Sequence, residues 1–220
     1  MKRSSILAVG GATVALVLSP AAALAAGTSV SVRVEGATRT LLRATTVHTH
    51  GGAITKGGTP AGACPATTAA GALDVATHHN WTGSYGSIGL SVNSIFGERH
   101  TFSSGKYWSI FVDNRYAQAG VCGLKLHRGE KLLFAAVPAK GTEYPIVLSA
   151  PAHAGRTFTV RASSYGDTGR SKPLSGVLVK GAGTTNAKGT VTVTVPRSGK
   201  VTLTASRKGY VRAEATVSVS

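Results

Sequence analysis

The sequence predicts a mainly β protein, in which a small α+β domain with a mixed sheet and one helix precedes an antiparallel β-sandwich. Three observations support this prediction. Glycine, alanine, serine, threonine and valine dominate a chain of 220 residues, and only 15% of the residues are charged, a composition that favours strands and turns over long surface helices. Apolar and polar residues alternate in many short segments, as in strands with one buried face. A single segment shows helical periodicity.

The N-terminal segment predicts export. Two basic residues precede an apolar run from Ile6 to Leu18, Pro20 ends this run, and Ala23 and Ala25 place small side chains where a signal peptidase cleaves. The run is short for a membrane span, and an N-terminal anchor is the alternative. We therefore expect residues 1–25 to be a cleaved signal peptide. The mature chain is expected to be secreted, without stable membrane insertion after cleavage.

Residues 26–139 are expected to form the α+β domain. Three valines alternate with Arg33 and Glu35 in Ser29–Glu35, which predicts a half-buried strand. Apolar residues at helical spacing predict a helix over Thr67–Thr77, just after a proline that suits a helix start. The other strands expected in this domain span Arg39–His48, Trp81–Tyr85, Leu90–Ile95, Tyr107–Val112 and Lys131–Val137.

Residues 140–220 are expected to form the β-sandwich, after a linker over Pro138–Pro145. This part has no cysteine or tryptophan, and its short alternating segments are separated by glycine-containing turns at regular spacing. Such spacing is typical of an antiparallel sandwich. The strands expected here span Ile146–Ser149, Thr157–Ser163, Leu174–Lys180, Thr190–Val195, Lys200–Ser206 and Arg212–Val219.

The two cysteines, Cys64 and Cys122, are expected to form a disulfide. An even number of cysteines in an exported chain favours a bridge, because thiols are oxidised outside the cytosol. The alternative is a cysteine nucleophile paired with one of the seven histidines.

The first domain resembles the small domain at the C-terminus of transcobalamins, which also occurs in exported bacterial proteins of unknown role. The matching pieces follow one another along the chain: Ala72-Leu73, Ser94–Gly97, Tyr107–Asn114, Ala117 with Gly120, and Leu126–Glu130 leading to Leu132 and Phe134. The chain departs from the family pattern at Asp113-Asn114-Arg115, where the family has Asn-Gly, and at Glu130, where it has Asp; both changes keep turn-forming residues. The resemblance implies an α+β fold and no shared catalytic residues. Corrinoid contact in transcobalamins also involves a separate helical domain, which this chain lacks.

The second domain resembles immunoglobulin-like and carboxypeptidase-regulatory-like modules of bacterial surface proteins. The resemblance rests on Leu174–Val179, Thr184–Gly189, Gly199–Ala205 and Lys208-Gly209-Tyr210. It implies an immunoglobulin-like β-sandwich and no particular function.

The chain is not expected to be an enzyme or to hold a cofactor. Hydrolytic chemistry needs a nucleophile with a base, or two carboxylates facing one cleft. The sequence has no nucleophile elbow and no phosphate-binding loop. Its eight acidic residues are scattered singly: Glu35, Asp74, Glu98, Asp113, Glu130, Glu143, Asp167 and Glu214.

A histidine-based metal site is an alternative that we leave unassigned. His48 and His50 are two residues apart on an expected strand and would share a face. Two such imidazoles can chelate Zn or Cu, but no carboxylate or free thiol nearby completes a set. Solvated histidines at a strand end are the simpler interpretation.

Aromatic residues of the first domain suggest a candidate ligand site. Trp108 and Tyr85 are the candidates for a stacking platform that binds a ring-shaped ligand. The alternative is ordinary core packing, because the aromatic strand has apolar residues on both faces. The aromatic residues considered are Trp81, Tyr85, Tyr107, Trp108, Phe111 and Tyr116.

Positive charge suggests a second candidate site. The formal net charge is +16, and residues 140–220 hold twelve basic against three acidic side chains. Such a surface attracts polyanions, so Arg207 and Lys208 are the candidates for binding an anionic cell-wall polymer or glycan. Nucleic acid is not expected, because the chain is exported and no aromatic residues interleave with the basic ones. The alternative is a surface that only confers solubility.

We therefore predict a secreted, non-enzymatic binding or adhesion module that acts at or near the cell envelope, with anionic polymers as the first candidate partner. One alternative is a small-ligand carrier of corrinoid-like type, which requires a concave aromatic pocket in the first domain. A metal-binding envelope protein is a further alternative, and the oligomeric state is left open.

Overall fold

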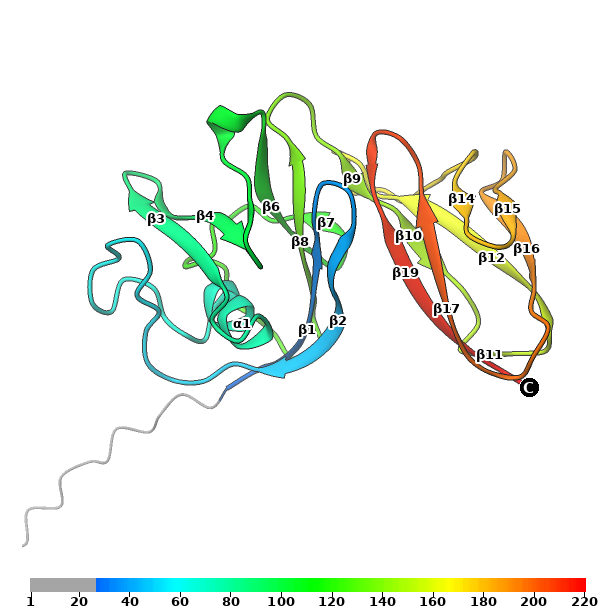
Figure 1. Ribbon diagram of the computed structural model, residues 1–220, viewed down its shortest axis with the longest axis horizontal. Helices are drawn as coiled ribbons and strands as arrows, with labels where there is room; N and C mark the ends of the chain where they lie inside the picture. The colour runs from blue at the N-terminus through cyan, green and yellow to red at the C-terminus, as the bar shows by residue number, and fades with distance from the viewer. Residues whose placement is uncertain (1–26) are drawn as a thin grey trace, which may run out of the picture.

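The computed structural model describes residues 27–220, so the predicted signal peptide at residues 1–25 lies outside the described residues. The described chain is mainly β, with one α-helix, and it forms two packed halves (Figure 1). No helix within this range is long and apolar enough to span a membrane.

The first half is built on a mixed sheet, as predicted. Its strands are ordered β2-β1-β8-β6-β7, and β1 runs parallel to β8 while the other pairs are antiparallel. A second, three-stranded sheet has the order β3-β4-β5. The elements are β1 (Ser29–Glu35), β2 (Thr40–His48), α1 (Ala69–Ala76), β3 (Trp81–Gly86), β4 (Gly89–Ile95), β5 (Glu98–Arg99), the 3₁₀ helix η1 (Phe102–Ser104), β6 (Lys106–Val112), β7 (Arg115–Tyr116) and β8 (Lys131–Pro138).

Helix α1 covers one face of the mixed sheet (Figure 1). Its alanines and Leu73 are fully buried and allow a close approach to the alternating valines of β1. Trp81, Trp108 and Phe134 complete this core, which therefore joins both sheets of the first half to the helix. Leu73 contributes the largest apolar side chain that the helix buries.

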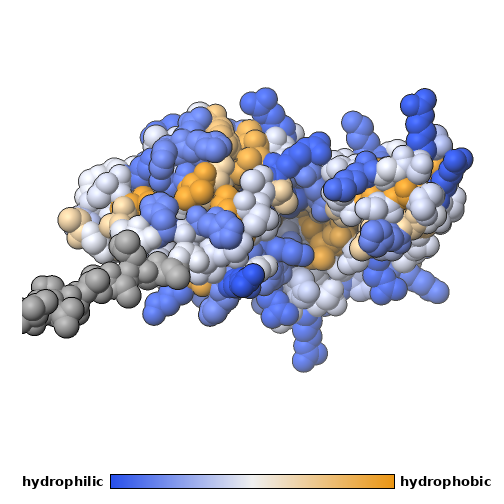
Figure 2. Space-filling model, turned by 90° about the horizontal axis from the view of Figure 1, so that it is seen from below, coloured by the Kyte–Doolittle hydropathy of each residue, from blue (hydrophilic) through white to orange (hydrophobic). Residues whose placement is uncertain are grey.

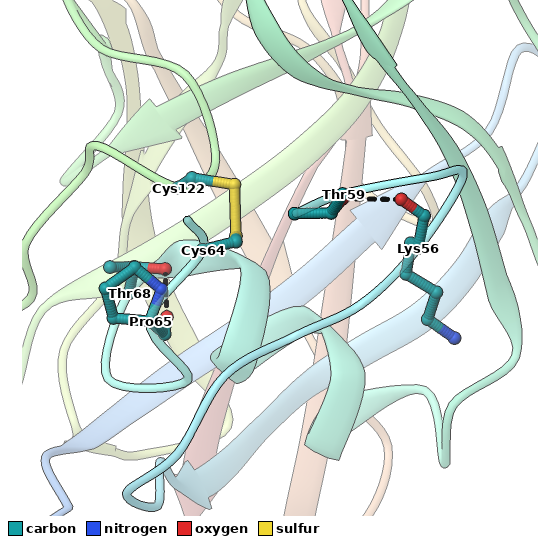
Figure 3. The surroundings of a disulfide bond; sticks show 6 residues. All are labelled: Lys56, Thr59, Cys64, Pro65, Thr68 and Cys122. Carbon is teal, nitrogen blue, oxygen red and sulfur yellow. Dashed lines mark hydrogen bonds between the residues drawn. A yellow bond between two sulfur atoms is a disulfide. The ribbon is translucent and has the colours of Figure 1, made fainter. Parts of the chain in front are cut away.

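The disulfide between Cys64 and Cys122 is present, as predicted, and joins chain segments 58 residues apart. It lies at the N-terminal end of α1 (Figure 3). Beside the bridge, the carbonyls of Val121 and Leu124 accept hydrogen bonds from two free amides of the first helical turn, Ala70 N–H and Ala69 N–H. The bridge therefore fastens the segment that caps the helix.

The second half is a sandwich of two sheets around its own core. One sheet has the order β10-β12-β13 with β16 also paired to β12, and the other has the order β11-β19-β17-β14-β15. All pairs are antiparallel except β11 with β19. The strands are β10 (Val147–Ser149), β11 (His153–Ala154), β12 (Thr157–Ser164), β13 (Lys172–Pro173), β14 (Leu178–Val179), β15 (Gly183–Thr184), β16 (Thr190–Thr194), β17 (Gly199–Ser206) and β19 (Ala213–Val219).

The predicted strand over Leu174–Lys180 is wrong in most of its length. The chain leaves one sheet at Pro173, and only Leu178–Val179 pair in the other. Gly176 has a φ of +66°, which turns the backbone between the two sheets. Thr185 supports this crossing, because its hydroxyl donates to the Leu174 carbonyl at 2.6 Å and accepts from the Val177 amide at 3.0 Å.

The last two residues of the expected linker over Pro138–Pro145 form a strand of a short sheet. Residues 140–142 are exposed, whereas β9 (Tyr144–Pro145) pairs in parallel with β18 (Tyr210–Val211). The expected boundary between residues 139 and 140 lies in the connection from β8 to β9.

The two halves share a third apolar core. It consists of Phe111 on β6, with Leu133, Ala135 and Val137 on β8, packed against Val211 of β18. Tyr144 of β9 packs on the same cluster, with its ring centroid 6.5 Å from that of Phe111. The second half thus covers the face of the mixed sheet that lies opposite helix α1.

A buried ion network joins the halves beside this core. Arg212 approaches the Glu35 carboxylate to 2.9 Å and donates to the Gly36 carbonyl at 2.7 Å. In return, Arg33 donates to the Arg212 carbonyl at 2.8 Å and lies 3.6 Å from Glu35. The Glu35 side chain is 1% exposed and that of Arg33 is 10% exposed, so these two charges are largely removed from water, whereas Arg212 keeps 28% of its side chain exposed.

A buried carboxylate, Asp74, ties helix α1 to β3. It accepts a hydrogen bond from Trp81 Nε1 at 2.7 Å and one from His79 at 2.5 Å, and Lys56 Nζ lies 3.4 Å away. Burial alone would raise the pKa of this carboxyl, but the hydrogen bonds from Trp81 and His79, together with Lys56, outweigh burial and hold its pKa below the ordinary value.

The depressed pKa of Asp74 predicts a pH-dependent contribution to stability. Because the carboxyl is more acidic in the folded than in the unfolded chain, its contribution is fully present above about pH 4 and is lost as the pH falls through the folded-state pKa. We expect Asp74→Asn to lower the free energy of unfolding by about 1–3 kcal/mol at pH 7 and by less at pH 3. Urea unfolding at both pH values measures this, with Glu143→Gln as the control. An equal loss at both pH values would contradict the assignment.

Candidate functional site

The β6–β7 hairpin leaves part of β6 without a neighbour. Asp113 and Asn114 both have positive φ, 47° and 66°, and form a two-residue turn that returns the chain along β6. Strand β7 then pairs only with Phe111 and Val112. After the Ala117 amide donates to the Ile110 carbonyl, the chain leaves β6. Among the described residues, the part of β6 that precedes Ile110 therefore has a neighbouring strand, β8, on one side only.

A groove of about 900 Å³ lies along this open part of β6. Residues of strand β4, of helix η1 and of the segment that follows β7 line it together with β6. Apolar and polar surface contribute to the lining in similar amounts. The lining includes Asn93, Arg99, Phe102, Tyr107, Trp108, Ile110, Tyr116 and Ala119.

Aromatic side chains form one edge of the groove. Phe102, which is 60% exposed, stacks on Tyr107 with ring centroids 4.2 Å apart. The hydroxyls of Tyr107 and Tyr116 lie 3.1 Å apart. Burial and the Tyr116 hydroxyl raise the pKa of Tyr107 to about 12, so its phenol stays protonated at neutral pH. The edge therefore offers a flat apolar face beside two hydroxyl groups.

Trp108, predicted as a ligand residue, lies in the lining of the groove and is 6% exposed. Its indole packs edge-on against His100, with ring centroids 5.2 Å apart. The indole Nε1–H is buried and has no hydrogen-bond partner among residues 27–220. A buried donor without a partner is costly, so the Trp108 Nε1–H is an unsatisfied polar group within the core beside the groove.

The structure does not bring the other predicted ligand residues to this groove. Tyr85 is exposed on β3, outside the lining. Arg207 and Lys208 lie in the turn between β17 and β18 of the second half, where the Arg207 guanidinium stacks over Tyr210 at 5.1 Å. The four predicted ligand residues therefore lie in three separate parts of the molecule.

The groove carries little charge. Among residues 27–220, Arg99 is the one charged residue in its lining, to which they contribute no carboxylate. Asn93, Gln118 and several hydroxyl groups supply the remaining polar side chains. Among the described residues, the lining thus offers stacking, hydrogen bonding and one positive charge.

Within residues 27–220, the structure does not bring the histidine pair together with a third potential metal ligand. Strand β2 ends at His48, so His50 lies beyond the strand, and its Nδ1 lies 2.8 Å from the Gly51 carbonyl oxygen. No three histidine, cysteine, aspartate or glutamate side chains gather anywhere in this range.

Sequence reasoning missed Phe102 and the residues after β7. Phe102 stands alone between polar residues, a pattern typical of a surface loop. Only the fold reveals that it stacks on Tyr107, because η1 must first be placed beside β6.

Comparisons with known proteins add little. No protein-family model matches the chain, and no curated protein matches it. One solved structure that is similar, from Ruminococcus gnavus, is described as a "putative metal binding protein"; the likeness covers 50% of this chain and 97% of that chain, at 13% identity and a TM-score of 0.35. A likeness at this TM-score says nothing about a ligand of this chain. The resemblance of the first half to the transcobalamin C-terminal domain stays a prediction.

Proposed function

We propose that this chain is an exported, non-enzymatic binding protein whose groove beside β6 takes an amphipathic ligand with a flat apolar face. The observation that carries this proposal is the aromatic edge of the groove, where Phe102 stacks on Tyr107 beside the Tyr116 hydroxyl. A preformed apolar concavity with a few fixed polar groups is the usual form of a ligand site.

The size and chemistry of the groove support this proposal. A volume of about 900 Å³ lies within the usual range for ligand sites. The stacked rings of Phe102 and Tyr107 offer van der Waals contact to a ring, and the amide side chains of Asn93 and Gln118 offer hydrogen bonds that would fix its orientation. The small-ligand carrier was expected to need a concave aromatic pocket in the first domain, and this groove meets that requirement. A corrinoid is one candidate ligand, from the resemblance alone.

Truncating Phe102 is expected to weaken ligand binding by about tenfold, equivalent to about 1.4 kcal/mol, because one of two stacked rings is lost. The change is Phe102→Ser. Fluorescence titration with 1-anilinonaphthalene-8-sulfonate measures the affinity, since this probe combines flat rings with an anionic group that Arg99 can meet. Cyanocobalamin, followed by absorbance, tests the corrinoid form of the proposal.

Leu178→Ser is the matched control, because Leu178 is 50% exposed and lies in the second half. The control should leave both titrations unchanged. If the two variants bind the probe with equal affinity, the groove is not its site and the proposal fails.

A second candidate function, binding of anionic polymers, rests on the charge of the second half. Long hydrophilic side chains project from its surface (Figure 2). The described part of this half has three acids, and one of them, Glu214, is close to Arg43 of the first half at 3.9 Å. Exposed cations such as Lys208 thus face solvent with few opposing charges.

Reversing two charges is expected to weaken polymer binding if these cations act as the site. We expect Arg207→Glu combined with Lys208→Glu to lower the affinity of the full chain for polyphosphate severalfold at low salt, because fewer anions are neutralised. Affinity of the natural chain should fall steeply as salt rises. Sedimentation with labelled polyphosphate measures both effects.

The matched control reverses two exposed cations of the first half, Lys125→Glu with Arg128→Glu. This control changes the net charge by the same amount as Arg207→Glu combined with Lys208→Glu. Equal weakening by both double variants would show attraction to overall charge rather than a site. Absence of binding by the natural chain at low salt would reject this second function.

A further inference from the structure

The open edge of β6 carries backbone groups that no strand satisfies. In an antiparallel sheet, the N–H and C=O of successive residues point alternately to the two sides of a strand. The amide of Asp113 donates to Lys131 on the β8 side, and the Gly105 carbonyl accepts from Ala139 on that side. The backbone groups of the odd-numbered residues of β6 therefore form hydrogen bonds with β8. The backbone groups of the even-numbered residues point away from β8.

The backbone N–H and C=O groups of the even-numbered residues lie on the groove side of β6. The Ile110 carbonyl is satisfied there by the Ala117 amide, and the Lys106 carbonyl accepts a hydrogen bond from the Ser104 hydroxyl at 3.4 Å. The N–H and C=O of Trp108 and the N–H of Ile110 are left, and no strand among residues 27–220 lies opposite them. The groove lining includes all four consecutive residues Tyr107–Ile110, as expected where a strand presents its edge.

We infer that this groove recognises an extended segment of a partner protein, which pairs with β6 as an additional strand. The free groups at Trp108 and Ile110 match the backbone donors and acceptors of an extended chain, a known mode of peptide recognition. The open edge between Lys106 and Ile110 is about 13 Å long, enough for four or five extended residues. This inference rests on the proposed function and names the ligand class.

The groove also favours particular side chains in that segment. A paired strand alternates its side chains between two faces. One face would meet Phe102, Tyr107 and Tyr116, and the other would meet the apolar side chains of β4 near Ile110. Arg99 is the only charge that the described residues place in the lining. The matching segment is therefore apolar at most positions and neutral or acidic overall.

The test uses acetylated and amidated hexapeptides in which valine, leucine, phenylalanine or tyrosine alternates with threonine or glutamate. Binding to the chain of residues 26–220 is followed by amide hydrogen exchange. We expect at least one peptide to slow exchange of the Trp108 amide tenfold or more. The Ser109 amide, which points to β8, is the internal control and should change little.

Two methylated versions of the binding peptide separate backbone pairing from side-chain contact. N-methylation of alternate residues removes the donors along one edge, and methylation of the other set removes those along the opposite edge. The version that is methylated along the edge facing β6 should bind at least thirtyfold more weakly than the version methylated along the opposite edge. Equal binding by the two versions would overturn the inference, as would failure of every hexapeptide.

A blocking variant locates the contact. Ala119→Trp places a large ring in the groove and should abolish peptide binding, whereas Ala187→Trp, an exposed alanine of the second half, should not. If the sulfonate probe binds in a Phe102-dependent manner but no peptide does, the proposed function stands and this inference fails. If Phe102 makes no difference to the probe, the proposed function fails as well.

Discussion

Replacing Glu35 with alanine is expected to lower the free energy of unfolding by about 3–5 kcal/mol, because the buried Arg33 and the partly buried Arg212 would lose the carboxylate that both contact. Glu35 also accepts a hydrogen bond from the Thr40 hydroxyl at 2.9 Å, which the change removes. Urea or thermal unfolding of the full chain measures the loss. We expect a single transition, since the ion network belongs to both halves.

Two controls identify the cause. Glu35→Gln keeps the size and part of the hydrogen bonding, so it should lose less than alanine. Arg43→Ala removes the ion pair with Glu214, in which Arg43 is 67% exposed; its cost should be below about 1 kcal/mol. If the Glu35 and Arg43 variants lose equal stability, the buried network contributes no more than a surface pair.

Removing the disulfide is the second large effect. Replacing both Cys64 and Cys122 with alanine should lower the free energy of unfolding by about 4 kcal/mol, because a loop of this length gains that much chain entropy in the unfolded state. The 58-residue separation is the quantity that sets this expectation. Urea unfolding measures it, and the natural chain with reductant is the control.

The position of the bridge adds a local consequence. Because the segment next to Cys122 caps α1, the double variant should also expose helix amides to faster hydrogen exchange, first at Ala69 and Ala70. Uniform exchange throughout the first half, with a stability loss below 1 kcal/mol, would contradict the role given to the bridge.

Local patterns predicted the longer strands well. The alternation around the valines placed a strand at Ser29–Glu35, and β1 has the same bounds. Two-residue strands such as β7 and β9 left no such pattern, because each exists only through its partner. The glycine crossing at Gly176 was hidden for a similar reason, since alternation continues on both sides of it.

The face of β1 shows the limit of reasoning from one strand. Alternation predicted a half-buried strand, with Arg33 and Glu35 on its polar face. Both are buried, because the second half covers this face and supplies Arg212. The groove was hidden in the same way: Trp108 was a sequence candidate, but Phe102 and Ala119 come from segments that only the fold brings to β6.

The shared core has a consequence for how such proteins can evolve. Separated from the second half, the first would expose Phe111, Leu133 and Val137 as an apolar patch and would leave Glu35 facing solvent. An unrelated sandwich joined at residue 139 would bring no equivalent of Val211 or Arg212. The two halves are therefore not portable units that can be exchanged freely between proteins. Recombination would have to transmit them together, or replace both surfaces at once.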